Sequence, residues 1–229
     1  MLWLFISLGV VGIAIAGWFA WRRHLRLQLA AEQLASLRAM VADDVTRFGE
    51  LYRQLPESGS TDYTQAGVAY SSALEASRAF RDPVAAGAIT QTLADAQYAV
   101  LRYTSTIAEQ SVPEQRVPCF FNPQHGPSAA DVLWTEPGRG TRRLPACADD
   151  AARITAGTQP SIRYVEQGGH QLPYWDAGPA FAPYGAGYFS RARSSQQFLH
   201  TNFGGQDNLD YGNPRHFTGR SPYPLEPRN

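Results

Sequence analysis

Three residues near the middle of the chain, Cys119, His125 and Cys147, have side chains that could act together chemically. Cysteine sulfur and imidazole nitrogen are the ligands that Zn²⁺ prefers, and a structural zinc site takes four ligands of this kind. His170 or Asp150 could supply the fourth. Zinc fingers usually place two cysteines about two to four residues apart, and this chain does not, so zinc is one hypothesis among several.

The two cysteines allow other interpretations. Cys119 and Cys147 could form a disulfide or a close pair of thiols that clamps a small module, or they could be unrelated buried side chains. A Cys119–His125 pair could activate a thiolate as a nucleophile, but the sequence offers no identifiable orienting side chain or oxyanion donor. We therefore expect no enzymatic activity, and no cofactor apart from the zinc ion considered above.

Other groups of polar residues carry no specific chemistry. Asp43-Asp44 and Asp149-Asp150 are adjacent acids, which on a helix usually form a solvated face or favour its first turn. Gly168-Gly169 and Gly204-Gly205 lack the following lysine and the strand-to-helix setting of a phosphate-binding loop. With 20 basic and 20 acidic residues the chain predicts no basic surface for nucleic acid. We expect neither a nucleic-acid partner nor a small-molecule substrate.

The elements that must position these residues begin with an apolar N-terminal segment. Residues 1–21 contain no charged side chain, and about 20 apolar residues in a helix span the roughly 30 Å hydrocarbon core of a bilayer. Basic residues follow this run, from Arg22 to Arg26, and none precedes it, which is the reverse of a cleaved signal peptide. The pattern predicts a retained single-pass transmembrane helix in the cell membrane, with the lipid bilayer as a partner. Because arginine flanks stay on the cytoplasmic side, the N-terminus is expected outside and the bulk of the chain in the cytoplasm.

Residues 22–112 are predicted to form a helical stem. Apolar residues recur every three or four positions over about residues 25–55, 62–80 and 83–109. Asp82 followed by proline is a strong signal for the start of the third segment. Three amphipathic helices with short connections predict a small antiparallel bundle, which continues the N-terminal helix without a joint. The same apolar stripes could instead bind a partner as a coiled coil.

The second half of the chain has a different character. Residues 113–178 are predicted to form a small α+β module, with a strand near 131–135, a short helix around Cys147 and a hairpin turn at Gly168-Gly169. Residues 179–229 are predicted to form an extended tail rich in glycine, proline and aromatic residues. Aromatic side chains at intervals of a few residues are typical of a segment that fills pockets on a partner. The tail residues expected to bind a partner are Tyr184, Tyr188, Phe189, Phe198, Phe203, Tyr211, Phe217 and Tyr223.

Three stretches of the second half are distinctive: the CFFNPQHGPS block at 119–128, the LPACADDA segment at 144–151 and the PYWDAGPAFAPY segment at 173–184. They resemble a family of uncharacterised single-span membrane proteins of actinobacteria. The resemblance covers about residues 1–190 and implies the same layout of span, helical stem, Cys/His block and aromatic-glycine segment. It implies no catalytic residues.

Together these patterns predict a mainly α fold. An N-terminal transmembrane helix continues into an antiparallel bundle, and a small α+β module and an extended tail follow. The predicted function is that of a non-catalytic accessory or assembly subunit of a larger bacterial membrane complex, such as a respiratory or other energy-converting complex. Its partners would be integral membrane subunits. The alternative is a membrane-tethered zinc-binding or thiol-redox domain that uses Cys119, His125 and Cys147.

Overall fold

The computed structural model describes residues 2–136, 140–192 and 198, and for residues 2–14 only the course of the backbone. Within these residues the protein is mainly helical with small two-stranded sheets, which confirms the coarse fold class predicted from the sequence. The elements in chain order are α1 (Leu2–Arg53), α2 (Thr61–Ala79), α3 (Pro83–Ile107), η1 (Pro123–His125), β1 (Ala130–Glu136), β2 (Gly140–Ala146), α4 (Ala148–Thr155), β3 (Tyr164–Gln167), β4 (His170–Pro173), η2 (Tyr174–Asp176), η3 (Pro179–Phe181) and α5 (Ala182–Tyr188).

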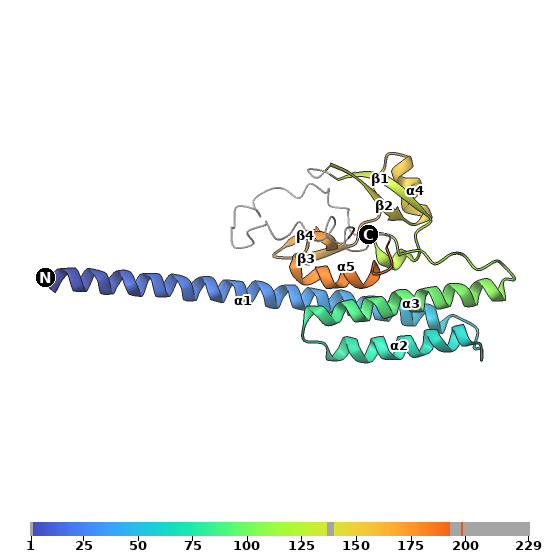
Figure 1. Cartoon of the computed structure of the whole chain (residues 1–229), viewed down its shortest axis with the longest axis horizontal. Coiled ribbons are helices and arrows are strands. Elements are labelled where there is room, and N and C mark those ends of the chain that lie inside the picture. Colours follow the sequence, from blue (N-terminus) through green and yellow to red (C-terminus); the bar gives the residue numbers. More distant parts are fainter. Residues whose placement is uncertain (1, 137–139, 193–197, 199–229) are drawn as a thin grey trace.

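The N-terminal prediction requires a correction. Among the residues that the structure describes, no helix has a stretch that is both long and apolar enough to cross a membrane. The apolar run ends before Arg22, and α1 continues beyond it as one helix that carries charged residues. The predicted transmembrane helix over residues 1–21 is therefore wrong, and so are the single-pass membrane localisation and the orientation derived from it. In the structure this part of α1 extends away from the rest of the molecule (Figure 1).

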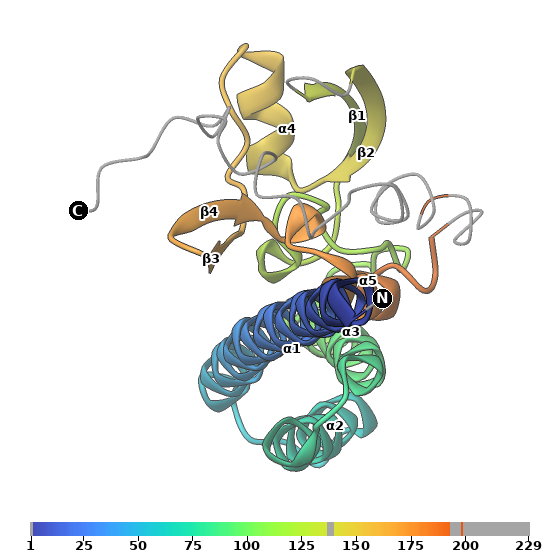
Figure 2. The same ribbon diagram turned by 90° about the vertical axis from the view of Figure 1, so that its left-hand side faces the viewer.

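The second half of α1 packs with α2 and α3 in an up-and-down arrangement (Figures 1 and 2). Ser60 caps α2 by accepting a hydrogen bond from the Tyr63 backbone N–H at 3.3 Å, and Asp82 caps α3 by accepting one from Val84 at 2.9 Å. The core between the helices is rich in small residues, so it contains little apolar side-chain volume. Its buried members include Leu37, Val41, Val45, Phe48, Ala66, Ala73, Ala86, Ile89, Leu93, Ala96, Ala99 and Val100.

Residues 179–188, predicted as the start of an extended tail, instead fold into η3 and α5, and α5 packs along α3. Glycines allow this close approach: a Cβ atom at Gly187 would collide with Thr90 Oγ1 and the Gly87 carbonyl. The Thr90 hydroxyl also donates to the Tyr184 carbonyl at 2.9 Å. The composition that suggested an irregular tail therefore serves a tight helix–helix contact. Residues 193–197 and 199–229 lie outside the described residues.

Two antiparallel pairs, β1 with β2 and β3 with β4, form the module that lies above the bundle (Figure 2). Gly168 and Gly169 have φ of 58° and 76°, as a two-residue hairpin turn requires, so the predicted hairpin is confirmed. Strands this short cannot bury a large core by themselves. Aromatic side chains fill the space between module, α5 and α1, with the Phe120 and Trp175 ring centroids 4.7 Å apart and Trp175 Nε1 donating to Glu136 Oε1 at 3.0 Å.

Candidate metal centre

Cys119 and His125 belong to a loop that the backbone closes on itself. The Cys119 N–H donates to the Gly126 carbonyl at 3.0 Å, and the Ser128 N–H donates to the Val117 carbonyl at 2.9 Å. Gly126 has φ of 80°, a conformation that favours glycine, which lets the chain turn back directly after His125. The loop therefore brings the thiol of Cys119 and the imidazole of His125 to the same side of the module.

Cys147 and Asp150 come from the start of α4. Cys147 is the N-cap residue, and its sulfur accepts a hydrogen bond from the Asp150 backbone N–H at 3.4 Å. Asp150 stands in the first turn, where a carboxylate is stabilised by the helix dipole. Its Oδ1 accepts a hydrogen bond from the Ser161 N–H at 2.7 Å, which leaves Oδ2 directed at the closed loop. Of the two interpretations of the adjacent acids, the place in the first turn of a helix is confirmed, whereas a solvated face is wrong for Asp150, which is completely buried.

The four side chains converge on one point. One donor atom from each of Cys119, His125, Cys147 and Asp150 can be chosen so that all lie within 4.8 Å of one another. Asp150 Oδ2 lies 2.9 Å from His125 Nδ1, 3.2 Å from Cys119 Sγ and 3.4 Å from Cys147 Sγ. Cys147 Sγ lies 3.7 Å from His125 Nδ1. Four residues of the right chemical types, distant in the sequence, are thus close enough together to hold a metal ion.

These distances are compatible with a bound metal ion. A carboxylate oxygen offers two lone pairs, yet three potential donors surround Asp150 Oδ2. A tetrahedral zinc ion with bonds of about 2.0–2.3 Å places its ligand atoms roughly 3.3–3.8 Å apart. The distances from Cys147 Sγ to Asp150 Oδ2, 3.4 Å, and to His125 Nδ1, 3.7 Å, lie in this range. The hydrogen bond from Ser161 to Asp150 Oδ1 also matches the way in which metal-bound carboxylates are usually held by a second partner.

The protonation states within the cluster are linked. Burial raises the pKa of the Cys119 thiol, and the nearby Asp150 carboxylate raises it further, although backbone N–H groups of Cys147 and Asn122 oppose this. Burial and Asp150 likewise raise the pKa of Cys147. Burial alone would raise the pKa of Asp150, but hydrogen bonds from His125, Ser161 and Cys119 outweigh it and lower the pKa to about 2. The cluster thus holds one carboxylate that stays ionised and two thiols that a divalent cation would deprotonate on binding.

The predicted ligands Cys119, His125 and Cys147 therefore meet in space, and Asp150 is the fourth member. His170, the other residue considered for that position, begins β4 and does not belong to this cluster. Cys119 and Cys147 are free thiols rather than a disulfide. The signal for Asp150 was present in the sequence as a nearby carboxylate, but spacing alone could not choose between it and a distant histidine.

Several of the aromatic residues predicted to bind a partner instead pack against other side chains of this chain. Tyr184, Tyr188 and Phe189 are completely or almost completely buried. Phe198 contacts Phe120 and Phe189, with ring centroids 6.0 and 5.2 Å apart. Four further residues of that prediction, Phe203, Tyr211, Phe217 and Tyr223, lie outside the described residues.

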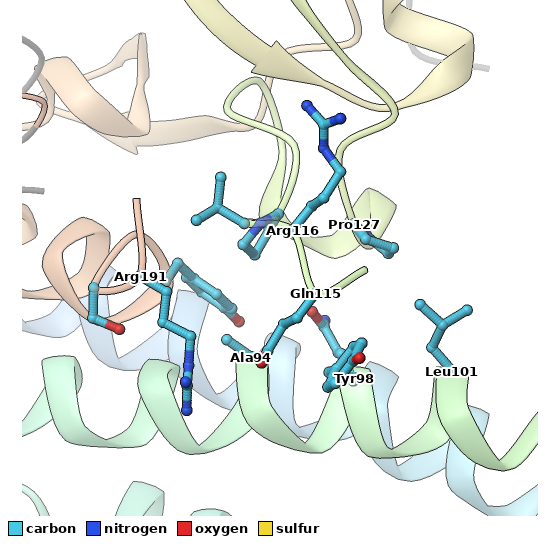
Figure 3. A pocket seen from close by; sticks show the side chains of 12 residues that line it. Ala94, Tyr98, Leu101, Gln115, Arg116, Pro127 and Arg191 are labelled. Atoms are coloured by element: carbon cyan, nitrogen blue, oxygen red, sulfur yellow. The ribbon is translucent and has the colours of Figure 1, made fainter. Parts of the chain in front are cut away.

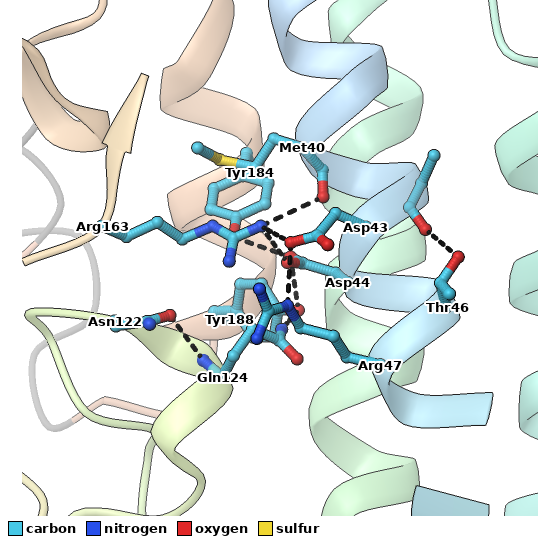
Figure 4. Close-up of polar contacts among 11 residues, drawn as sticks. Met40, Asp43, Asp44, Thr46, Arg47, Asn122, Gln124, Arg163, Tyr184 and Tyr188 are labelled. Carbon is cyan, nitrogen blue, oxygen red and sulfur yellow. Dashed lines mark hydrogen bonds and ion pairs between the residues drawn. The ribbon is translucent and has the colours of Figure 1, made fainter. Parts of the chain in front are cut away.

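A second polar cluster joins the module to α1 (Figure 4). Asp44 is completely buried, and its Oδ2 accepts hydrogen bonds from the hydroxyls of Tyr184 at 2.7 Å and Tyr188 at 3.0 Å. Arg163 Nη2 lies 2.7 Å from Asp44 Oδ1 and 2.8 Å from Asp43 Oδ2. Burial raises the pKa of Asp44 to about 6, against the opposing effects of Arg163 and the tyrosine hydroxyls. The expectation of a solvated acidic face fails at Asp44 because the module covers this side of α1.

Two pockets adjoin these clusters. One borders the four-residue cluster itself and includes His125, Cys147, Asp150 and Arg153 in its lining. The other lies between α3 and the segment that leads into the module, with Tyr98, Gln115 and Arg191 among its lining residues (Figure 3). Its described lining contains neither cysteine nor histidine, whereas the first pocket is lined by both.

Comparisons with models of known families, with curated proteins and with solved structures found no match for this chain. The resemblance to an actinobacterial membrane family stays a prediction.

Proposed function

We propose that the protein is a non-catalytic zinc-binding protein, in which one Zn²⁺ bound by Cys119, His125, Cys147 and Asp150 stabilises the module. The observation that carries the proposal is the convergence of two sulfurs, one imidazole nitrogen and one carboxylate oxygen within 4.8 Å. Thiolate and imidazole ligands together favour zinc over the hard cations magnesium and calcium, which take oxygen ligands.

The proposed role of the ion is structural. A catalytic zinc site keeps one position free for water or substrate, whereas a structural site is closed by four protein ligands. Here four side chains of suitable type are at hand, and three of them are buried. Such an ion would join the loop that holds Cys119 and His125 to the start of α4, which holds Cys147 and Asp150. This supports metal binding over a thiol-redox function, which would not use His125 and Asp150 as ligands.

We propose further that the zinc-stabilised module and the bundle serve an accessory or assembly role through protein–protein contacts. Large apolar side chains on the extended part of α1 support this role, because contiguous exposed apolar surface is typical of interaction sites. Ile15, Trp18, Phe19 and Trp21 are between 45% and 59% exposed. Affinity purification of the full-length protein followed by mass spectrometry should recover a partner in stoichiometric amount, and recovery of this chain alone would contradict the assembly role.

Cobalt substitution tests the metal site most specifically. Co²⁺ in a tetrahedral site with thiolate ligands gives intense visible absorption and a sulfur-to-metal charge-transfer band. We expect both bands in the wild type, a loss of the charge-transfer intensity in Cys119→Ser and Cys147→Ser, and altered visible bands in Asp150→Asn. Two matched controls, Asp149→Asn and His170→Ala, should leave the spectrum unchanged. A wild-type spectrum like that of free hydrated cobalt would contradict the proposal.

A further inference from the structure

Asp44 belongs to a group of polar contacts that connects the module with the metal cluster to α1. The Asp44 carboxylate lies in the second half of α1 and is completely buried, so it needs partners for its charge. Its side-chain partners come from the other half of the chain (Figure 4). Tyr184 and Tyr188 lie in α5, and Arg163 directly precedes β3. Each partner must be held in place for α1 to bury this carboxylate at low cost.

A first path leads from His125 to Asp44. Gln124, the residue directly before His125, donates from Nε2 to the Tyr188 hydroxyl at 2.7 Å. The same hydroxyl donates to Asp44 Oδ2 at 3.0 Å. Gln124 is itself fixed by its backbone N–H, which donates to Asn122 Oδ1 at 3.0 Å (Figure 4). Holding the imidazole of His125 therefore also holds the group that orients Tyr188.

A second path leads from Asp150 to Asp44. The Ser161 N–H donates to Asp150 Oδ1 at 2.7 Å, and two residues later the Arg163 N–H donates to the Phe121 carbonyl at 2.9 Å. The Arg163 side chain then reaches Asp44 Oδ1 at 2.7 Å. Hydrogen bonds to Asp150 and Phe121 thus fix the segment from Ser161 to Arg163. The Arg163 guanidinium neutralises the buried charge of Asp44 on α1.

We infer that metal binding and the docking of the module on α1 are coupled through these two paths, which meet at Asp44. The inference rests on the zinc site proposed above and adds that zinc binding regulates the docking of the module on α1. An ion that holds His125 and Asp150 together fixes Gln124 and the segment of Arg163, and so keeps the partners of Asp44 in position. Loss of the ion frees both paths and leaves a buried carboxylate less well paired, which weakens docking. Coupling is reciprocal, so a weakened Asp44 cluster must also weaken zinc binding.

Hydrogen exchange on the full-length protein measures the first direction of this coupling. Zinc-loaded and chelator-treated protein would be compared by mass spectrometry for a peptide that covers residues 40–48 of α1. We expect exchange in this peptide to become about tenfold faster without zinc, as for a typical coupling energy. A peptide from residues 62–73 of α2, on the far side of the bundle from the module, should change little.

A pair of tyrosine variants measures the reverse direction. Tyr188→Phe keeps the ring but removes the hydroxyl that links Gln124 to Asp44, and we expect zinc affinity to fall about five- to tenfold. The matched control is Tyr103→Phe, which removes a hydroxyl that donates to the Pro56 carbonyl at 2.6 Å, in the connection between α1 and α2. Zinc affinity in this control should equal that of the wild type, although both variants lose one hydrogen bond.

The outcomes separate the inference from the proposed function. If zinc binds but exchange in residues 40–48 does not respond to it, and both tyrosine variants bind zinc like the wild type, the coupling is absent and the metal site stands. If no zinc binds, the proposed site and the coupling that rests on it are both overturned. Should Tyr188→Phe fail to fold, the exchange measurement on the wild type still decides the question.

Discussion

The bundle and the module of this protein are stabilised in different ways. In the bundle, three helices satisfy their own backbone hydrogen bonds and need only a continuous apolar stripe to associate, so alanine-rich faces are enough. The module has two short strand pairs and an eight-residue helix, α4, which bury little surface by regular packing. Aromatic side chains and one cluster of four polar ligands replace that packing. The difference indicates that a small irregular region needs an additional cross-link such as a structural metal ion, whereas a helical region does not.

Removal of zinc should therefore affect the two regions unequally, and this is the largest effect we expect. Structural zinc contributes apparent binding energies of about 10 kcal/mol or more, so the module should lose its fixed packing when a chelator removes the ion. Near-ultraviolet circular dichroism, which reports on buried Trp134 and Trp175, should decline, while the far-ultraviolet helical signal of the bundle is largely retained. An aromatic signal that survives complete chelation would contradict the distinction between the two regions. The same treatment of Cys147→Ser serves as the control and should cause no further change.

Leu93→Ala tests whether the stability of the bundle can be lowered without loss of zinc from the module. Leu93 is completely buried, and truncation of such a leucine removes apolar contacts and leaves a cavity that costs about 2–5 kcal/mol. The midpoint of chemical denaturation should fall accordingly, whereas the zinc content per folded chain should stay unchanged. A loss of zinc in this variant would show that the regions are not stabilised separately.

Gly187→Ala acts at the junction of the two regions. The new Cβ would collide with Thr90 Oγ1 and the Gly87 carbonyl where α5 crosses α3, and overpacking of this kind costs about 1–3 kcal/mol. We expect a lower melting temperature together with increased exposure of Tyr184 and Tyr188, measurable as tyrosine accessibility to a small quencher. Gly59→Ala is the matched control, because no atom lies within 4 Å of a Cβ there. Equal melting temperatures for the two variants would count against the close helix contact.

Asp82→Ala should have the smallest effect, confined to the bundle. The Asp82 side chain accepts a hydrogen bond from the Val84 N–H at 2.9 Å, and loss of such a cap costs about 1 kcal/mol. Denaturant titration should show a small decrease in stability with an unchanged zinc affinity. Asp82→Asn, which can still accept the hydrogen bond, should restore most of the difference, and failure to do so would argue against capping as the cause.

The bundle could be predicted from the sequence because its information is local. Helical periodicity and the Asp82-Pro83 start signal located α1, α2 and α3, and Gly168-Gly169 located the hairpin of β3 and β4. The same local reasoning misjudged α5, because the glycine- and proline-rich composition of this segment predicts an extended tail, whereas Gly187 permits close contact with α3. It also took the apolar N-terminal run for a membrane span.

The metal centre could be predicted only in part because its geometry is not local. Residue types pointed to Cys119, His125 and Cys147, but the convergence with Asp150 depends on how the closed loop faces the start of α4. The burial of Asp44 was also out of reach, since the residues that cover it lie more than a hundred positions later in the chain. Pairs of adjacent acids look alike in the sequence, and only the packing of the module distinguishes the buried member.

The central claim is that the four converging side chains hold one zinc ion, and metal content tests it most directly. Full-length protein, loaded with zinc and then freed of unbound metal by desalting, would be analysed by inductively coupled plasma mass spectrometry beside Cys147→Ser and Asp149→Asn. We predict about one zinc per chain in the wild type and in Asp149→Asn, and a loss of most of it in Cys147→Ser. A wild-type protein that is folded and retains no zinc would contradict the account.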